Sequence, residues 1–153
     1  MNIDARLTEL GLSLPAAPKP IAAYIPSRRA GDLLFVSGQL PWRDGKLIAA
    51  GKVPSAVTIE QAQSAAAQCA LLGLSILAGE INNDWERLAA VIRIGVFVQS
   101  EHDFTEQAKV ANGASELLQQ ILGDTGRHSR AAVGVNALPL NASVEVEFLF
   151  QLK

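Results

Sequence analysis

Residues 144–152 run Val-Glu-Val-Glu-Phe-Leu-Phe-Gln-Leu, and this run decides the fold class. Its even-numbered residues are all apolar, whereas Glu145, Glu147 and Gln151 occupy odd-numbered positions. Side chains alternate between the two faces of a strand, so this period of two predicts a strand with one face on a core. Both glutamates then share the opposite face.

Upstream of this strand, the sequence alternates between helical and strand patterns. The predicted elements are strands at 33–37 and 46–49 around an Asp44-Gly45 turn, a helix from the cap Thr58 to about Leu77, a strand at 91–98, a helix at 105–122 that Gly123 ends, and a strand at 131–138. This order predicts an α+β domain in which two helices cover one face of a mixed sheet. The strand at 33–37 is apolar on both faces, which favours an oligomer that buries the second face.

The chain is long enough for one domain, since it has 153 residues of which 49% are apolar. Residues 1–20 are predicted to form an N-terminal arm, and residues 21–153 the domain. Prolines at 15, 18 and 20 make the end of the arm extended. A short helix at 3–12, capped by Asn2 or Asp4, precedes them.

The composition argues against several classes of protein. A net charge of -2 and a pI near 5.7 disfavour nucleic-acid binding, which depends on Lys and Arg. One cysteine, Cys69, and two histidines disfavour a disulfide or a metal centre. The uncharged run between Glu60 and Glu80 is interrupted by amides, which favours a buried helix over a membrane span. No signal peptide pattern is found, so we expect a cytoplasmic protein.

Arg130 is the first candidate for chemistry. It shares a strand face with Ala132 and Gly134, whose small size leaves room for a guanidinium to grip a carboxylate with two hydrogen bonds. The alternative is a solvated arginine at a strand end. His128 has the same parity and either reaches the same pocket or lies in a surface loop.

Three further side chains have two interpretations each. Glu145 and Glu147 are either catalytic acids or part of a solvated strand face. Asn112 lies about 180° around its helix from the apolar stripe and faces either water or a neighbouring subunit. Cys69, among alanines and leucines in mid-helix, fits a buried inert thiol better than a nucleophile.

These residues, taken together, resemble the YjgF/RidA family of reactive-intermediate deaminases. The resemblance covers about residue 21 to the C-terminus and rests on Tyr24, the run Leu-Leu-Phe-Val-Ser-Gly-Gln-Leu-Pro at 33–41, Val-Phe-Val at 96–98, Arg130, Leu138-Pro139 and Val-Glu-Val-Glu at 144–147. His128-Ser129 and Ala132 replace the Pro-Ala and Cys that flank this arginine in short members. Together with extra residues near 101–107 and the longer arm, they place the chain in a longer branch.

The resemblance implies a chorismate-mutase-like fold, a homotrimer with sites between subunits, and hydrolysis of 2-imino or enamine acids to 2-oxo acids and ammonia. It implies no cofactor, no metal, and no nucleic-acid or membrane partner. Arg130 matches the family's carboxylate-binding arginine and Glu145 its acidic residue. The substrate-binding positions are matched by Tyr24, Ser37, Gly38 and Asn112, with His128 added from the parity argument.

Two other functions remain open from the sequence. One is a non-enzymatic sensor that binds a carboxylate metabolite in the Arg130 pocket. The other is an endoribonuclease, an activity that the L-PSP name attaches to some relatives. The acidic pI and the few histidines disfavour the endoribonuclease.

Overall fold

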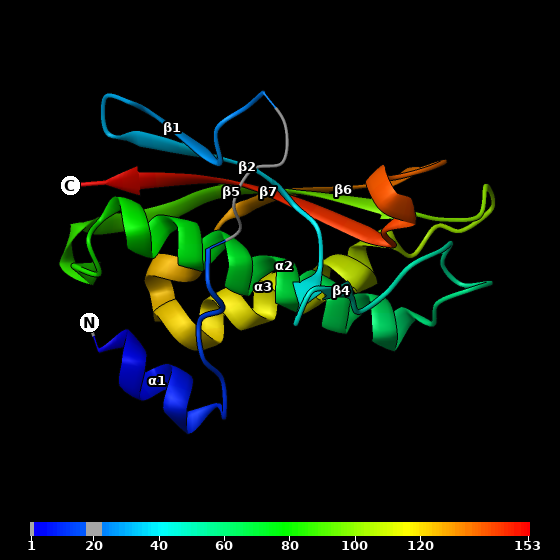
Figure 1. The fold of residues 1–153 in the computed structure, drawn as a ribbon, viewed down its shortest axis with the longest axis horizontal. Helices are drawn as coiled ribbons and strands as arrows, with labels where there is room; N and C mark the ends of the chain where they lie inside the picture. Colours follow the sequence, from blue (N-terminus) through cyan, green and yellow to red (C-terminus); the bar gives the residue numbers. More distant parts are fainter. Residues whose placement is uncertain (1, 18–22) are drawn as a thin grey trace.

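The protein is described by a computed structural model that covers residues 2–17 and 23–153. Figure 1 shows a sheet with α2 and α3 side by side on one face and α1 beyond α3. The strands are β1 (Ser27–Ala30), β2 (Leu33–Gln39), β3 (Trp42–Arg43), β4 (Lys46–Leu47), β5 (Leu88–Gln99), β6 (Ser129–Val135) and β7 (Val144–Leu152); the α-helices are α1 (Ile3–Glu9), α2 (Ile59–Glu80) and α3 (Gln107–Leu122). The predicted α+β architecture is confirmed.

The main sheet has the order β1-β2-β7-β5-β6, in which only the β5–β6 pair is parallel. Strand β7 lies in the middle, and its alternating pattern is confirmed: Val144 and Val146 are buried, whereas Glu145 is only half-buried. The even-numbered residues face α2. A Cβ at Gly73 of α2 would lie 2.5 Å from the ring of Phe148, so this glycine lets the helix pack close to the sheet.

The other face of the sheet is open in a single chain. Leu34 and Val36 of β2 are buried under the helices, but Phe35 between them is 48% exposed. Val133 of β6 is likewise 45% exposed. The apolar odd-numbered residues of β6 therefore lie on the face that the helices leave open. One chain therefore covers one face only, and exposed apolar side chains mark the other.

The long uncharged run forms α2, and Thr58 caps it in a reciprocal capping box with Gln61. The helix continues three residues beyond the predicted end, through Gly79 to Glu80. It is long and apolar enough to cross a membrane, but 78% of its most apolar stretch is buried inside the fold. It therefore serves as the core helix of the domain.

The strand predictions need correction. The strand predicted at 131–138 is β6, which begins at Ser129 and already ends at Val135. The Asp44-Gly45 hairpin exists, but its strands β3 and β4 form a separate two-stranded sheet, and the second one ends at Leu47 rather than at 49. One edge of the main sheet is formed by β1, a strand that was not predicted, which pairs with β2 across the Gly31 turn. Three of the four residues of β1 are exposed. An exposed strand needs no apolar face, and its run Ser-Arg-Arg-Ala accordingly lacks the alternation that would have predicted a strand.

The predicted N-terminal helix is shorter than expected and begins after Asn2, whose side chain accepts a hydrogen bond from the Ala5 amide. Ile3 and Leu7 are buried, and the helix packs on α3. The predicted extended arm at 14–20 lies partly outside the described residues. Its described part, up to residue 17, has no regular secondary structure.

Helix α3 positions the polar side chains discussed below. It begins at Gln107, two residues later than predicted, and ends where Gly123 takes a φ of 61°. A Cβ at Gly113 would overlap the carbonyl of Gln63, so glycine here lets α3 approach α2 closely. This close packing fixes the height of α3 above β6.

Candidate functional site

Arg130 lies on the helix-covered face of β6 and reaches α3. Its Nη1 donates to Oδ1 of Asn112 at 2.9 Å and to Oγ of Ser115 at 3.0 Å. Asn112 therefore faces Arg130 of its own chain, rather than only water or a neighbouring subunit as expected. Both bonds use Nη1, which leaves the N–H groups of Nη2 and Nε along one edge of the guanidinium. That edge has the geometry for a two-pronged contact with a carboxylate.

His128 joins this group through Ser115. Its Nδ1 lies 2.6 Å from the carbonyl oxygen of Gly126, and its Nε2 lies 2.9 Å from Oγ of Ser115. A carbonyl only accepts, so Nδ1 carries the proton and Nε2 accepts from the serine hydroxyl. The hydroxyl in turn accepts from Arg130, which gives one continuous chain of hydrogen bonds. Desolvation lowers the pKa of His128, the hydrogen bond to the Gly126 carbonyl raises it and the charge of Arg130 lowers it, and together they leave the pKa below its ordinary value.

Ser115 was not predicted from the sequence. The signal was present, because Ser115 follows Asn112 by three residues and such pairs lie on one side of a helix. A residue three positions after the expected pocket asparagine lies beside it on the helix, so this spacing indicates Ser115. We name Asn112, Ser115, His128 and Arg130 the arginine cluster.

A second group forms where β2 meets β7. The pairing of the two strands shifts register between Val36 and Gln39, so Ser37 and Gly38 form an irregularity in β2. The carboxylate of Glu145 lies over Gly38, where a Cβ would overlap its Oε1. Only glycine leaves room for this carboxylate. Ser37, Gly38 and Glu145 are therefore brought together, and we name them the acid cluster.

Tyr24 approaches the same bulge through the backbone. The Ser37 hydroxyl donates to the carbonyl of Ile25 at 2.9 Å, and the Ser37 amide donates to that of Pro26. These bonds hold the segment after Tyr24 against β2. The tyrosine side chain is 52% exposed, and the structure shows no hydrogen bond between it and the acid cluster.

The two glutamates of β7 have different surroundings. Glu147 forms an ion pair with Arg93 of β5 at 3.1 Å. Glu145 has no hydrogen bond or ion pair with any described residue. Desolvation, and then the charge of Glu147, raise the pKa of Glu145. A half-buried carboxyl with a raised pKa and no partner is suited to exchange a proton with a water or a substrate.

The arginine cluster and the acid cluster lie on opposite faces of the sheet. The arginine cluster faces α3, whereas Glu145 is on the open face of β7, with β5 between β7 and β6. Across the sheet, Glu145 aligns with Phe97 and Val133, so Arg130 is also three residues, about 10 Å, further along. One chain therefore does not bring Arg130 and Glu145 into contact.

Cys69 and the metal-binding residue types form no further centre. Cys69 is fully buried, and desolvation raises its pKa well above the ordinary value, as expected for an inert thiol. Within the described ranges 2–17 and 23–153, no three His, Cys, Asp or Glu side chains are grouped to hold a metal ion.

Comparison with known proteins places the chain in a family. Residues 4–152 match the family described as YjgF/chorismate mutase-like, whose description also names an endoribonuclease. The chain belongs to the YjgF/chorismate mutase-like family. The predicted resemblance is confirmed over a longer stretch than expected, because the match includes most of the N-terminal arm.

Curated relatives of this YjgF-family chain have diverse names. Protein TCP17 of Trypanosoma cruzi is 42% identical over 152 residues, which cover 99% of this chain and 94% of TCP17. The RutC family protein y4sK of Sinorhizobium fredii is 33% identical, with 92% and 96% of the two chains covered. A 2-iminobutanoate/2-iminopropanoate deaminase of Dermatophagoides farinae is 24% identical over 136 residues, covering 89% and 91%.

Solved structures of YjgF-type proteins share the fold over its whole length. The protein Atu1372 of Agrobacterium tumefaciens, of unknown function, is 44% identical and superposes with a TM-score of 0.93, covering 99% of this chain and 92% of its own. A Shewanella oneidensis protein with an endoribonuclease name is 28% identical, with a TM-score of 0.95 and coverage of 99% and 100%. The chorismate-mutase-like fold is thereby confirmed.

Proposed function

We propose that this protein hydrolyses 2-imino and enamine acids of the 2-aminoacrylate type to 2-oxo acids and ammonia. The observation that carries the proposal is the free edge of Arg130, which the arginine cluster holds ready for a carboxylate. Family membership and the distant deaminase relative support the reaction class. No cofactor or metal is part of the proposal.

Arg130 would fix the substrate by its carboxylate. Asn112 and Ser115 hold Nη1, so little side-chain entropy is lost when the substrate binds. The imine carbon is then held at a constant position relative to Arg130. Fixing the reacting carbon is a large part of what such a reaction needs, since imines already hydrolyse in water.

Glu145 would accept a proton from the attacking water and donate protons to the substrate nitrogen. An enamine first becomes the imine by moving a proton to carbon. The carboxylate then takes one proton from a water molecule as the oxygen attacks the imine carbon, and returns this proton to the nitrogen, which gives a neutral carbinolamine. It next takes the hydroxyl proton and passes it to the amino group, so that the C–N bond breaks, ammonia leaves and the carbonyl forms. The raised pKa of Glu145 suits a group that takes and returns a proton. Backbone groups at Ser37 and Gly38 lie next to this carboxylate and would hold the substrate nitrogen.

The separation of the two clusters supports a site shared between copies of the chain. Arg130 and Glu145 lie on opposite faces of one sheet, so a site that uses both takes one from each of two chains. The open face carries the exposed Phe35 and Val133, which a neighbouring chain would cover. We propose a homotrimer with three such sites.

A cleavage of RNA by the histidines has less support. His128 has a lowered pKa and is bound within the arginine cluster, whereas His102 lies in the loop after β5 and is exposed. The two histidines therefore do not form an acid and base pair. Pocket binding of a carboxylate without catalysis remains the competing outcome of the test below.

The test measures ammonia release from 2-iminopropionate that an amino-acid oxidase generates in the same solution, beside an RNA-cleavage control. We expect wild-type protein to accelerate hydrolysis, and Arg130→Lys to lose most of this effect. Pyruvate binding without any acceleration would replace the deaminase with a carboxylate sensor. RNA cleavage that persists in the Arg130→Lys variant would contradict the assigned site.

A further inference from the structure

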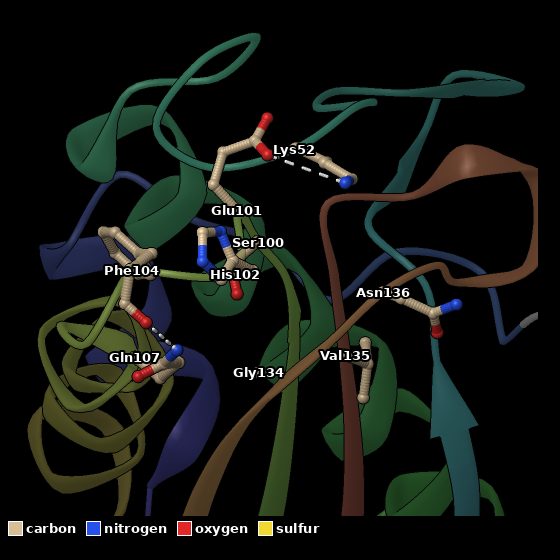
Figure 2. A pocket seen from close by; sticks show the side chains of 9 residues that line it. All are labelled: Lys52, Ser100, Glu101, His102, Phe104, Gln107, Gly134, Val135 and Asn136. Atoms are coloured by element: carbon tan, nitrogen blue, oxygen red, sulfur yellow. Dashed lines mark hydrogen bonds and ion pairs between the residues drawn. The ribbon is translucent and has the colours of Figure 1, made fainter.

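A hollow of about 380 Å³ lies where the carboxyl ends of the parallel strands β5 and β6 meet the start of α3. Figure 2 shows the lining side chains: Lys52, Ser100, Glu101, His102, Phe104, Gln107, Gly134, Val135 and Asn136. None of them belongs to the arginine cluster or the acid cluster. Gly134 is four residues beyond Arg130 on the same strand face, about 13 Å away along β6.

Glycine at position 134 keeps the floor of this hollow open. A Cβ there would lie 2.8 Å from Oγ of Ser100 and 2.8 Å from Nε2 of Gln107. Two polar groups from different elements therefore converge on the space above Gly134. Since Gly134 is not among the residues with positive φ, its backbone does not require glycine, and open space is what glycine provides here.

The floor offers hydrogen-bond donors that the fold leaves unused. Ser100 is only 6% exposed, yet its hydroxyl has no hydrogen bond within the described part of the chain. Gln107 donates one N–H of Nε2 to the Phe104 carbonyl at 2.6 Å, which fixes the amide and leaves the second N–H for the hollow. No buried side-chain oxygen or nitrogen among the described residues lacks a partner, so the Ser100 hydroxyl is reached by solvent from the hollow, and a ligand oxygen there would take the place of water as its partner.

Charged and polar side chains form the rim of the hollow. Glu101 accepts from Ser55 Oγ at 2.6 Å and pairs with the Lys52 ammonium at 3.6 Å, so the lysine offsets the negative charge of Glu101 (Figure 2). Lys52 keeps further N–H groups, and the exposed side chains of His102 and Asn136 add donors. The ring of Phe104 provides an apolar wall.

We propose that this hollow binds a small carboxylic acid with a flat apolar body. The carboxylate would accept from Ser100 and Gln107 at the floor and from Lys52 at the rim, and the apolar body would lie on Phe104. The volume suits a small metabolite. This site is additional to the proposed deaminase site, and it provides a place for a regulatory acid.

The test is ligand-observed ¹⁹F NMR of 4-fluorobenzoate with the full chain carrying Arg130→Ala, so that the other proposed carboxylate site does not contribute. We expect line broadening that unlabelled benzoate reverses. Adding Gly134→Ala or Ser100→Ala weakens binding about tenfold, because the first fills the floor and the second removes a donor. Gly79→Ala, at an exposed glycine with open space around it, is the matched control and leaves binding unchanged.

Three results would overturn the proposal. They are no broadening at millimolar 4-fluorobenzoate, unchanged binding in both Gly134→Ala and Ser100→Ala, and equal binding of the neutral 4-fluorobenzamide. If Gly134→Ala does not fold, as judged by its thermal melt, Ser100→Ala and Lys52→Gln decide. Because Arg130 is absent throughout, failure of this site leaves the deaminase proposal untouched.

Discussion

The arginine cluster and the acid cluster differ in how fully the fold satisfies them. In the arginine cluster, hydrogen bonds join Arg130 to Asn112 and Ser115, and Ser115 to His128. In the acid cluster, the Glu145 carboxylate lies over Gly38 and has no partner among residues 2–17 and 23–153. In the proposed site, a single chain would therefore complete the carboxylate-binding half, and substrate, water or another copy would complete the half around Glu145.

Arg130→Lys gives the largest expected effect. Lysine cannot offer two parallel N–H bonds or keep both contacts to α3, so most activity should be lost. Arg130→Ala should cost about 2–4 kcal/mol in kcat/KM. Steady-state rates of imine hydrolysis measure both. Arg127→Ala is the control, since Arg127 is exposed and pairs only weakly with Asp124 at 3.8 Å. Equal losses at Arg127 and Arg130 would remove Arg130 from the site.

Glu145→Gln should lower turnover about 100-fold while carboxylate binding stays nearly intact, because glutamine keeps the size but loses the basic oxygen. Glu147→Gln is the matched control on the same strand face, and it loses only the ion pair with Arg93. Parallel turnover assays and pyruvate titrations separate the two. Equal losses, or a larger loss at Glu147, would show that the wrong glutamate was assigned.

Glu145→Gln should raise the thermal stability of the protein, although it lowers turnover. Because the folded-state pKa of Glu145 is raised, the protonated form favours folding, and this contribution is lost as pH rises through the folded pKa. Glu145→Gln mimics the protonated form, so its thermal midpoint should exceed that of wild type above this pKa and match it at acid pH. A lower midpoint at neutral pH would mean that the carboxylate has a stabilising partner.

Much of the fold could be predicted from the sequence because its signals are local. The alternation in β7, the capping box at Thr58 and the stop at Gly123 each depend on a few neighbouring residues. Strand β1 was missed because it is an exposed edge without apolar alternation, held by pairing with β2. The β3–β4 hairpin was recognised, but its separation from the main sheet is a tertiary property that the turn does not encode.

Among the site residues, too, those with a local signal in the sequence could be predicted, and those that depend on tertiary packing could not. Arg130, Glu145, Ser37 and Gly38 stand within recognisable runs, so the sequence could nominate them. The placement of Arg130 and Glu145 on opposite faces could not be predicted, because it depends on the register of β6 against β5 and of β5 against β7. Ser115 lacks such a run, and its only signal in the sequence is the three-residue spacing from Asn112, whereas its contact with Arg130 depends on the packing of α3 above β6.

Ser115→Ala should have a moderate effect. Arg130 keeps Asn112 but loses its second anchor, so kcat/KM should fall by about 0.5–1.5 kcal/mol, mainly through KM. Ser64→Ala is the control, because the Ser64 hydroxyl bonds only to its own helix at Glu60. A loss confined to thermal stability, with KM unchanged, would make Ser115 a structural residue only.

His128 should give the smallest effect, visible as a pH dependence of stability. The folded-state pKa of His128 is lowered, so its neutral form stabilises the folded protein. This contribution to the free energy of unfolding is complete above the unfolded pKa near 6.5 and is lost as pH falls through the folded pKa. The free energy of unfolding should therefore decline below about pH 6.5 more in wild type than in His128→Gln. His102→Gln, at an exposed position, is the control and should retain the wild-type slope.

The most direct test of a shared site mixes two inactive variants. Arg130→Ala and Glu145→Gln, carrying different tags, are co-expressed and the mixed oligomers isolated. If each site of a homotrimer takes Arg130 from one chain and Glu145 from the next, every isolated mixed trimer has one intact site of its three, and activity should rise to about one third of wild type. Mixed oligomers as inactive as either parent would contradict the account, as would a protein that remains monomeric.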